Sequence, residues 1–178
     1  MEGRRGFIGA ALTLLAFARS AWAQAASGTP IRYAMLSRPV RIPLETVAAP
    51  WHPVSFVAEA YVRAARSGSA GSAERRVLIS GVLFRTEANL SALCVTCPHE
   101  QCQVDLVTDA ERLARMPGNV SSHPLFECGC HFSVFDAANE GARLSGETPR
   151  GLYRFRIAGV HDGFVDITEI EEVALSEV

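Results

Sequence analysis

Alternation of apolar and polar residues is the dominant pattern in the middle of the chain. In residues 54–64 the apolar side chains occupy alternate positions, which is typical of a strand with one buried face. Two further runs rich in β-branched and apolar residues follow at 75–85 and 89–95, and both predict strands. The glycine- and serine-rich segment 66–74 predicts a flexible connection between the first two strands.

A hairpin is predicted near the end of the chain. Apolar residues recur through 151–160 and again through 164–168, as expected for two short strands. The sequence His161-Asp162-Gly163 between them has the composition of a tight turn. The apolar contacts of this hairpin are expected from Leu152, Phe155 and Ile157.

The remaining segments show little helical periodicity. Residues 24–53 contain five prolines, so we expect an extended lead-in there and no helix. Residues 108–116 have the one convincing short helical pattern. The sequence therefore predicts a small antiparallel all-β domain with an inserted segment at about 94–136.

Length and composition agree with one folded domain. The chain has 178 residues, of which 48% are hydrophobic, and this is enough to form a core. All 17 basic residues are arginine, and the formal net charge is −2. Because no basic patch interleaves with aromatic residues, we do not expect nucleic-acid binding.

Residues 1–23 have the pattern of an export signal. The paired Arg4 and Arg5 precede an apolar run at 7–18, and small residues at 21–23 provide a cleavage site. The apolar run is too short to cross about 30 Å of hydrocarbon. We therefore predict a cleaved twin-arginine signal peptide, with a retained membrane anchor as the alternative.

Export by the twin-arginine route would have two consequences. The route carries folded proteins, often those that receive a cofactor in the cytoplasm, so a metal cofactor is expected. The destination is a bacterial periplasm, where oxidising conditions permit disulfide bonds.

Five cysteines and two histidines gather in the inserted segment. They lie in two short stretches, CVTCPHEQC at 94–102 and ECGCHFS at 127–133. Cysteine and histidine are the common ligands of zinc and of iron–sulfur centres, so these side chains are candidate metal ligands. They are Cys94, Cys97, His99, Cys102, Cys128, Cys130 and His131.

Two arrangements of these residues leave some of them unused. A zinc site could combine Cys94 and Cys97 with Cys128 and Cys130, but the second pair is closely spaced and neither histidine takes part. A set of structural disulfides would leave one of the five cysteines over and would not explain the histidines.

A third arrangement pairs Cys97 with His99 and Cys128 with His131. The stretches CPHEQC and CGCHFS, which contain these pairs, resemble the Rieske iron–sulfur motif, C-x-H-x-x-C followed by C-x-C-H-x-S. The motif is specific because it requires six residues at fixed offsets in two loops. In a Rieske centre two histidines replace two cysteines on one iron of a 2Fe-2S cluster.

The resemblance implies a fold and a set of domain boundaries. It implies a Rieske-like antiparallel β-sandwich or barrel with an inserted cluster-binding subdomain. The Rieske domain itself is expected at 50–170, after an extended segment at 24–49 and before a tail at 171–178.

The resemblance also assigns roles to the cysteines and histidines. It implies that Cys97 and Cys128 bind one iron as thiolates and that His99 and His131 bind the other as neutral imidazoles at an exposed tip. The remaining assignments are a disulfide between Cys102 and Cys130, which ties the two loops together, and a buried apolar position for Cys94.

Two residues after the second motif are expected to tune the reduction potential. Ser133 matches a serine of the family whose hydroxyl donates a hydrogen bond to a bridging sulfide. Phe135 stands where members of high potential have a tyrosine that donates to a ligand sulfur. Because phenylalanine has no such donor, we expect a potential below that of the quinol-oxidising relatives.

The resemblance points more to one branch of the family than to another. Members of the cytochrome bc complex usually have Leu-Gly where this chain has Glu100-Gln101, and a carboxylate does not suit an apolar quinone pocket. The stretch CHFSVFDAANEGARL looks more like the small subunit of arsenite oxidase. The acids Glu100, Asp105 and Glu127 near the loops could attract a basic partner.

Three functions follow as hypotheses. The first is a periplasmic electron-transfer subunit between a larger oxidoreductase subunit, for which a molybdenum-containing one is a candidate, and a cytochrome c-type acceptor. The second is the iron–sulfur subunit of a quinol–cytochrome c reductase. The third, of a different class, is a zinc-stabilised periplasmic binding module.

Overall fold

The computed structural model describes residues 30–63, 74–116 and 122–177. The predicted signal peptide at 1–23 and the predicted flexible connection at 66–74, except for its last residue, lie outside this part of the chain. The described elements belong to one compact unit, Ile31–Val178. They are β1 (Tyr33–Pro43), η1 (Leu44–Val47), β2 (Val54–Arg63), β3 (Glu74–Arg85), β4 (Leu90–Cys94), β5 (Val104–Val107), α1 (Ala110–Arg115), β6 (Leu125–Cys128), β7 (Val134–Asp136), β8 (Ala142–Ser145), β9 (Phe155–His161), β10 (Phe164–Glu171) and α2 (Ala174–Glu177).

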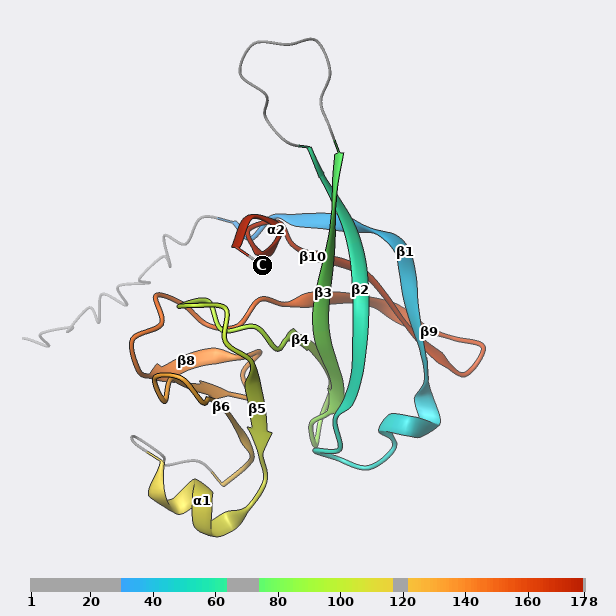
Figure 1. Cartoon of the computed structure of the whole chain (residues 1–178). Coiled ribbons are helices and arrows are strands. Elements are labelled where there is room, and N and C mark those ends of the chain that lie inside the picture. The colour runs from blue at the N-terminus through green and yellow to red at the C-terminus, as the bar shows by residue number, and fades with distance from the viewer. Residues whose placement is uncertain (1–29, 64–73, 117–121, 178) are drawn as a thin grey trace, which may run out of the picture. The chain divides into compact units, whose positions relative to one another are not determined.

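The strands form three antiparallel sheets. Their orders are β1-β10-β9, β2-β3-β4 and β5-β6-β7-β8, and every pairing between neighbours is antiparallel. The prediction of an antiparallel all-β domain is therefore confirmed. Figure 1 shows the long pair β2–β3 apart from the group of shorter strands that contains β5, β6 and β8.

The second half of β3 and the end of β4 are buried on both of their faces. On β3, Ile79 and Leu83 belong to a core shared with β1, β9 and β10, whereas Val82 and Phe84 point into a second core shared with β5, β6 and β7. This explains why residues 81–84 are all buried, since a strand covered on both sides needs no polar face. This part of the sheet is thus a middle layer between the other two sheets, whereas Val57 and Tyr61 of β2 and Leu78 of β3 are exposed.

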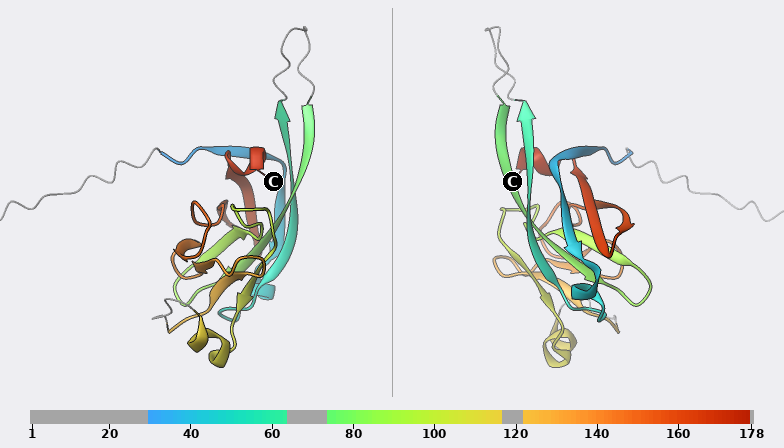
Figure 2. Two further views of the ribbon diagram at one scale, coloured as in Figure 1. Left: turned by 60° about the vertical axis from the view of Figure 1, so that its left-hand side comes forward. Right: turned by 90° about the vertical axis from the view of Figure 1, so that its right-hand side faces the viewer.

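The first core packs two sheets face to face. Phe56 of β2 and Phe155 of β9 meet edge to face, with their ring centroids 5.0 Å apart. Gly81 lies against both rings, because a Cβ there would be 2.4 Å from the Phe56 ring and 2.7 Å from the Phe155 ring. The contact between β1 and β2 continues this packing, and the two strands lie side by side in both views of Figure 2.

The lead-in predicted from the prolines is in part a strand. Residues Tyr33–Pro43 form β1, which pairs with β10 at the edge of its sheet. The short 3-10 helix η1 follows directly after Pro43, so the expectation of no helix at 24–53 was wrong for this turn. The register of β1 shifts between Met35 and Val40, and Pro39 lies inside this irregularity. An edge strand and a bulge both tolerate the missing N–H of proline, so the prolines did not exclude a strand.

The turn of the late hairpin and the short helix agree with the sequence prediction, but β9 begins only at Phe155, and Leu152, which was expected to contribute to the hairpin, lies in the second core. In the turn between β9 and β10, Asp162 and Gly163 have φ of 52° and 78°, as a two-residue turn with two left-handed positions requires. Helix α1 begins after Asp109, whose carboxylate accepts a 2.8 Å hydrogen bond from the backbone N–H of Arg112. Among the described residues no helix is long and apolar enough to span a membrane.

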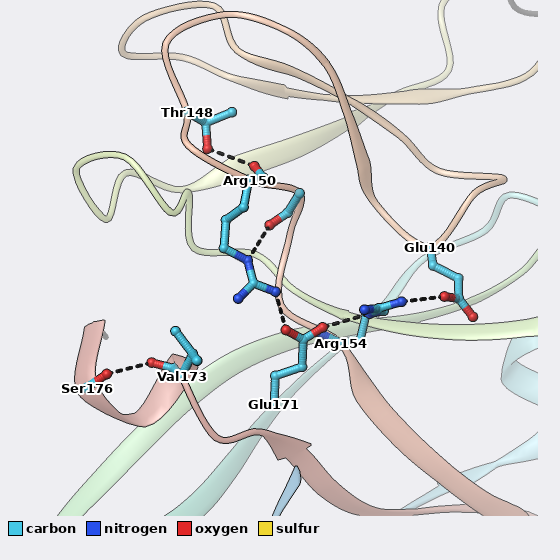
Figure 3. A network of polar contacts seen from close by, with 8 residues as sticks. Glu140, Thr148, Arg150, Arg154, Glu171, Val173 and Ser176 are labelled. Carbon is cyan, nitrogen blue, oxygen red and sulfur yellow. Dashed lines mark hydrogen bonds and ion pairs between the residues drawn. The ribbon is translucent and has the colours of Figure 1, made fainter. Parts of the chain in front are cut away.

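A buried carboxylate ties the third sheet to the end of β10. Glu171, the last residue of β10, is buried and accepts hydrogen bonds from the side chains of Arg150 and Arg154. Arg154 also donates to Glu140 at 2.6 Å, and Figure 3 shows both arginines reaching the Glu171 carboxylate. Arg150 and Glu140 belong to the loops around β8. This network therefore connects the sheet β1-β10-β9 with the sheet β5-β6-β7-β8.

Candidate metal centre

The β5–β6 ladder brings the two cysteine stretches to the same place. Val104, the first residue of β5, pairs with Cys128, the last residue of β6. The first stretch precedes β5 and the second follows β6, so in an antiparallel ladder both leave from the same end. Helix α1, which follows β5, lies at the other end of that strand (Figure 1).

The first of these loops, residues 97–102, closes on itself through the backbone of Cys97. The Cys97 carbonyl accepts a hydrogen bond from Gln101 N–H at 3.0 Å, and the Cys97 N–H donates to the carbonyl of Cys102 at 2.7 Å. Gln101 has φ of 59°. The loop therefore reverses the chain with one residue in the left-handed region at its fifth position.

The second loop, residues 128–133, has the same hydrogen-bond pattern. The Cys128 carbonyl accepts from Phe132 N–H at 3.0 Å, and the Cys128 N–H donates to the carbonyl of Ser133 at 2.9 Å. Phe132 has φ of 54° and occupies the same fifth position that Gln101 occupies in the first loop. The two loops are thus structural copies of one turn, each beginning at a buried free cysteine.

A disulfide joins the two loops. Cys102 and Cys130 are bonded, with their Cα atoms 6.4 Å apart and a sequence separation of 28. This pair was expected from the family resemblance. It also removes Cys130 from the zinc arrangement, which needs that residue as a free thiolate.

The histidines of the two loops lie next to each other. The ring centroids of His99 and His131 are 4.8 Å apart. His131 Nε2 faces the Glu100 carboxylate at 3.8 Å. His99 Nδ1 is buried and has no hydrogen-bond partner among the described residues.

The two loop cysteines that remain free are buried neighbours. Cys97 and Cys128 are 1% and 2% exposed. Burial raises the pKa of the Cys97 thiol above its ordinary value, and the adjacent Cys128 thiol raises it further, although the backbone of His99 opposes the shift. Without a metal this thiol keeps its proton, so metal binding at Cys97 has to displace one.

Two separate groups of possible ligands occur among the described residues. In one, ligand atoms of His99, Glu100 and His131 lie within 4.8 Å of one another, and in the other those of Cys102, Cys128 and Cys130 do. The disulfide occupies two of the three sulfurs in the second group. The histidines thus lie in a different group from Cys128, the one free thiol of the second group. Separate histidine and cysteine groups agree with two irons that have different ligands.

Ser133 is held against a glycine from the third sheet. The side chain is fully buried, and its Oγ has no hydrogen-bond partner in the described part of the chain. Gly146, which follows β8 and has φ of +96°, is so close that a Cβ there would lie 2.4 Å from the Ser133 Cα. Only glycine fits this position, and the sequence analysis did not identify it.

Phe135 and Cys94 occupy different cores. Phe135 lies on β7, is fully buried, and shares the second core with Cys97 and Cys128. Cys94 is the last residue of β4 and belongs to the first core, so it faces away from the loop cysteines. This confirms that Cys94 is a buried apolar position, and burial raises the pKa of its thiol.

A histidine contact at the end of β6 and β7 away from the cysteine loops was not predicted. His123 Nε2 lies 2.7 Å from the carboxylate of Asp136, which directly follows Phe135 in the chain. The His123 ring stacks on Trp51, with the ring planes 12° apart. The position of Asp136 after the CHFS stretch could have suggested a role, but nothing in the sequence places Trp51 nearby.

Comparison with known families agrees with this geometry. The family model of the Rieske [2Fe-2S] domain matches residues 51–156, which include both loops. The chain belongs to the Rieske family. The cofactor of this Rieske domain is a 2Fe-2S cluster, and its role is electron transfer. No curated protein matches the chain in sequence.

The side chains between the loops fit such a cluster. A buried imidazole nitrogen and a buried hydroxyl without partners would each cost free energy in a closed apolar site. In the Rieske domain, His99 Nδ1 has the chemistry of an iron ligand and Ser133 Oγ that of a hydrogen-bond donor to a sulfide. The two orphaned atoms and the two buried thiols therefore match the group that the family binds.

Proposed function

We propose that Cys97 and Cys128 hold one iron of the cluster and that His99 and His131 hold the other. The observation that carries this assignment is the pair of matching loops, which the Cys102–Cys130 disulfide joins and which present two buried thiols and two adjacent imidazoles. Cys94 has no part in it, because it lies in the other core.

This ligand set determines the chemistry that the cluster supplies, which is reversible transfer of one electron at about −150 to +300 mV. Neutral imidazoles contribute less negative charge than thiolates, so adding an electron is easier than in an all-cysteine centre. His131 places its outer nitrogen toward solvent beside Glu100, at the side where a partner can approach. The buried cysteines and Phe135 keep water from the opposite side.

The chain acts, in this proposal, as the iron–sulfur subunit of a periplasmic oxidoreductase. A larger subunit of the arsenite-oxidase type donates electrons, and a cytochrome c-type protein accepts them. Two features support this reading over a quinol-oxidising one: the carboxylate of Glu100 is exposed at the tip, and Phe135 lacks the hydroxyl found in relatives of high potential. A disulfide between the loops suits the oxidising periplasm, to which the twin-arginine pattern directs the chain.

Metal analysis of the purified protein tests the ligand assignment. We expect iron and labile sulfide in equal amounts, and an electron paramagnetic resonance signal after dithionite reduction. The variants Cys97→Ala and His99→Ala should lose the signal, whereas Cys94→Ala is the matched control and should keep it. Colourless protein that contains zinc, or loss of the signal in the Cys94 variant, would contradict the assignment.

Isolation of the native complex tests the proposed partners. Affinity purification from the periplasm of the native host should yield a molybdenum-containing subunit together with the chain. A cytochrome b in its place would favour the quinol–cytochrome c reductase and refute the arsenite-oxidase-like reading.

A further inference from the structure

Both cluster loops have a non-glycine residue where the turn requires a left-handed backbone. Gln101 and Phe132 have φ of 59° and 54°, and each donates the N–H that closes its loop. Glycine adopts this conformation without a steric penalty, whereas for a bulky side chain it is unfavourable. The fold alone would therefore favour glycine at both positions.

In the described part of the structure, the Phe132 ring has little packing that could offset this strain. Its exposed fraction is 64%, the second highest among the large exposed hydrophobic residues of the described chain. Aromatic side chains in strained conformations are normally retained by the packing of their rings. In the described part of the structure no stacking or cation–π contact involves the Phe132 ring.

The position of Phe132 indicates that its ring is contacted when a partner protein binds. It follows His131 directly, and His131 lies beside His99 at the solvent-facing side of the centre. A protein that approaches these histidines closely enough to exchange an electron must also cover Phe132. The contact that would offset the strain is therefore intermolecular.

The charges around the tip indicate the chemistry of the partner. Glu100 is exposed beside His131, and Asp105 is an exposed acid on β5. Glu127, opposite Asp105 in the ladder, is already paired with Arg112. An acidic tip repels anionic lipid, and two copies meeting through it would bring like charges together.

We infer that Phe132 is the aromatic anchor by which the tip docks a basic one-electron carrier protein. The ring enters an apolar recess beside the carrier's redox group, and Glu100 and Asp105 face its basic rim. One electron leaves the reduced centre of this chain and reduces the ferric haem of the carrier, with no bond formed or broken. This inference rests on the proposed function and adds a specificity-determining residue to it.

Two substitutions separate the ring from the backbone strain. Phe132→Gly removes both, and Phe132→Ala removes the ring but keeps a side chain at positive φ. Val160→Ala is the control, since Val160 is a 45% exposed apolar residue on β9. It lies outside the sheet β5-β6-β7-β8, which carries the cluster loops and is called the cluster sheet below. All are prepared as the cluster-containing protein, and ferricytochrome c is the carrier used.

We expect both Phe132 variants to bind ferricytochrome c about tenfold or more weakly in an NMR titration with both proteins oxidised. Their oxidation by ferricytochrome c should slow to a similar extent, while oxidation by ferricyanide, which needs no docking, stays unchanged. The melting temperature of Phe132→Gly should equal or exceed that of the original protein, and Val160→Ala should change neither binding nor rate.

Several results would overturn the inference. They are unchanged binding and rate in both Phe132 variants, no reaction of the original protein with ferricytochrome c, and a lower melting temperature for Phe132→Gly. Dimerisation or binding to anionic vesicles that is lost in Phe132→Gly would assign the ring to another occupant. Because each variant is first checked for its paramagnetic signal, these results are distinct from absence of the cluster, which would refute the proposed function.

Discussion

At the scale of single residues, the environment of each cysteine separates its chemistry from that of its neighbours. Cys97 and Cys94 are three positions apart, and both are buried thiols with raised pKa. The end of β4 directs Cys94 into the core between two sheets, while the loop that follows directs Cys97 toward Cys128. From their spacing alone, both cysteines could be zinc ligands. Which side of the strand each cysteine faces is known only when the sheets that pack against the strand are known.

Phe135→Tyr should raise the reduction potential. Phe135 is fully buried in the core that contains Cys97 and Cys128, and we expect a hydroxyl on its ring to donate to a ligand sulfur. A hydrogen bond that favours the reduced state by about 1 kcal/mol corresponds to about 40 mV for one electron. Protein-film voltammetry measures the shift.

Phe84→Tyr is the control for this change, since Phe84 lies in the same core but on β3. It should lower stability through overpacking and leave the potential unchanged. An equal shift in both variants would show that the hydroxyl acts through general polarity, and no shift in Phe135→Tyr would refute the role assigned to Phe135.

Cys94 should resist alkylation in the folded protein and make stability fall at alkaline pH. Burial raises the pKa of its thiol, so above about 8.5 the unfolded state binds fewer protons than the folded state. The stabilisation is complete below that pH and is lost as the pH rises, at up to about 1.4 kcal/mol per pH unit.

The melting temperature between pH 7 and pH 10 tests the sign of this effect. It should fall more steeply for the original protein than for Cys94→Ala. Iodoacetamide should label Cys94 at pH 8.5 only after unfolding, as judged by mass spectrometry. Parallel melting curves, or rapid labelling of the native protein, would contradict the burial of this thiol.

At the scale of elements, the local sequence pattern predicted the strands in which apolar and polar residues alternate. It missed strands that depend on pairing with distant segments. The predictions at 54–64, 75–85 and 89–95 correspond to β2, β3 and β4 within a few residues. β1 was missed because its prolines are tolerated at an edge and in a bulge. β8 is short and half exposed, so its residues lack a periodic signature, and the cluster sheet continues beyond the predicted insert at 94–136.

The same reasoning explains which parts of the site could be predicted. The motif gave Cys97, His99, Cys128 and His131, because each loop is a short local turn with fixed offsets. Gly146 was not foreseen, since its importance comes from Ser133 on a different segment of the chain. Contacts between distant segments leave no periodic trace in one sequence.

Gly146→Ala should destabilise the protein and lower the reduction potential. An added Cβ would lie 2.5 Å from the Ser133 Oγ, so Ser133 must move away from its buried position. The combined cost of the collision and of a side chain at φ +96° should be about 2–4 kcal/mol. Displacement of the hydroxyl removes a hydrogen bond that favours the reduced state.

Gly163→Ala is the matched control for Gly146→Ala. Gly163 also has positive φ, of +78°, but nothing lies within 4 Å of an added Cβ. Gly163→Ala should lower the stability by only about 1 kcal/mol, which is the cost of a side chain at positive φ, and leave the reduction potential unchanged. Equal potentials in the two variants would show that Ser133 does not donate to the cluster.

At the scale of the whole molecule, an apolar core and a buried ionic network hold the cluster sheet to the other two sheets. The apolar part is the second core, where Val82 and Phe84 of β3 meet Phe126 of β6. The ionic part joins Glu171 of β10 to Arg150 and Arg154. The apolar contacts extend the hydrophobic burial of β3, whereas the network fixes the orientation of loops that have few buried side chains.

Glu171→Gln should destabilise the folded protein strongly. The change leaves two partly buried guanidinium groups without their shared carboxylate, and loss of one partner of a buried pair costs about 3–5 kcal/mol. Glu172→Gln is the control, because Glu172 pairs with Arg32 in an exposed contact whose side chains are 54% and 82% accessible. The midpoint of urea unfolding, followed by circular dichroism, should fall for Glu171→Gln and stay within experimental error for Glu172→Gln.

Since Arg150 lies shortly after Gly146, the loop that supports Ser133 should loosen as well, and the potential of Glu171→Gln should shift toward that of Gly146→Ala. A stable Glu171→Gln protein with an unchanged potential would mean that the apolar core alone orients the cluster sheet.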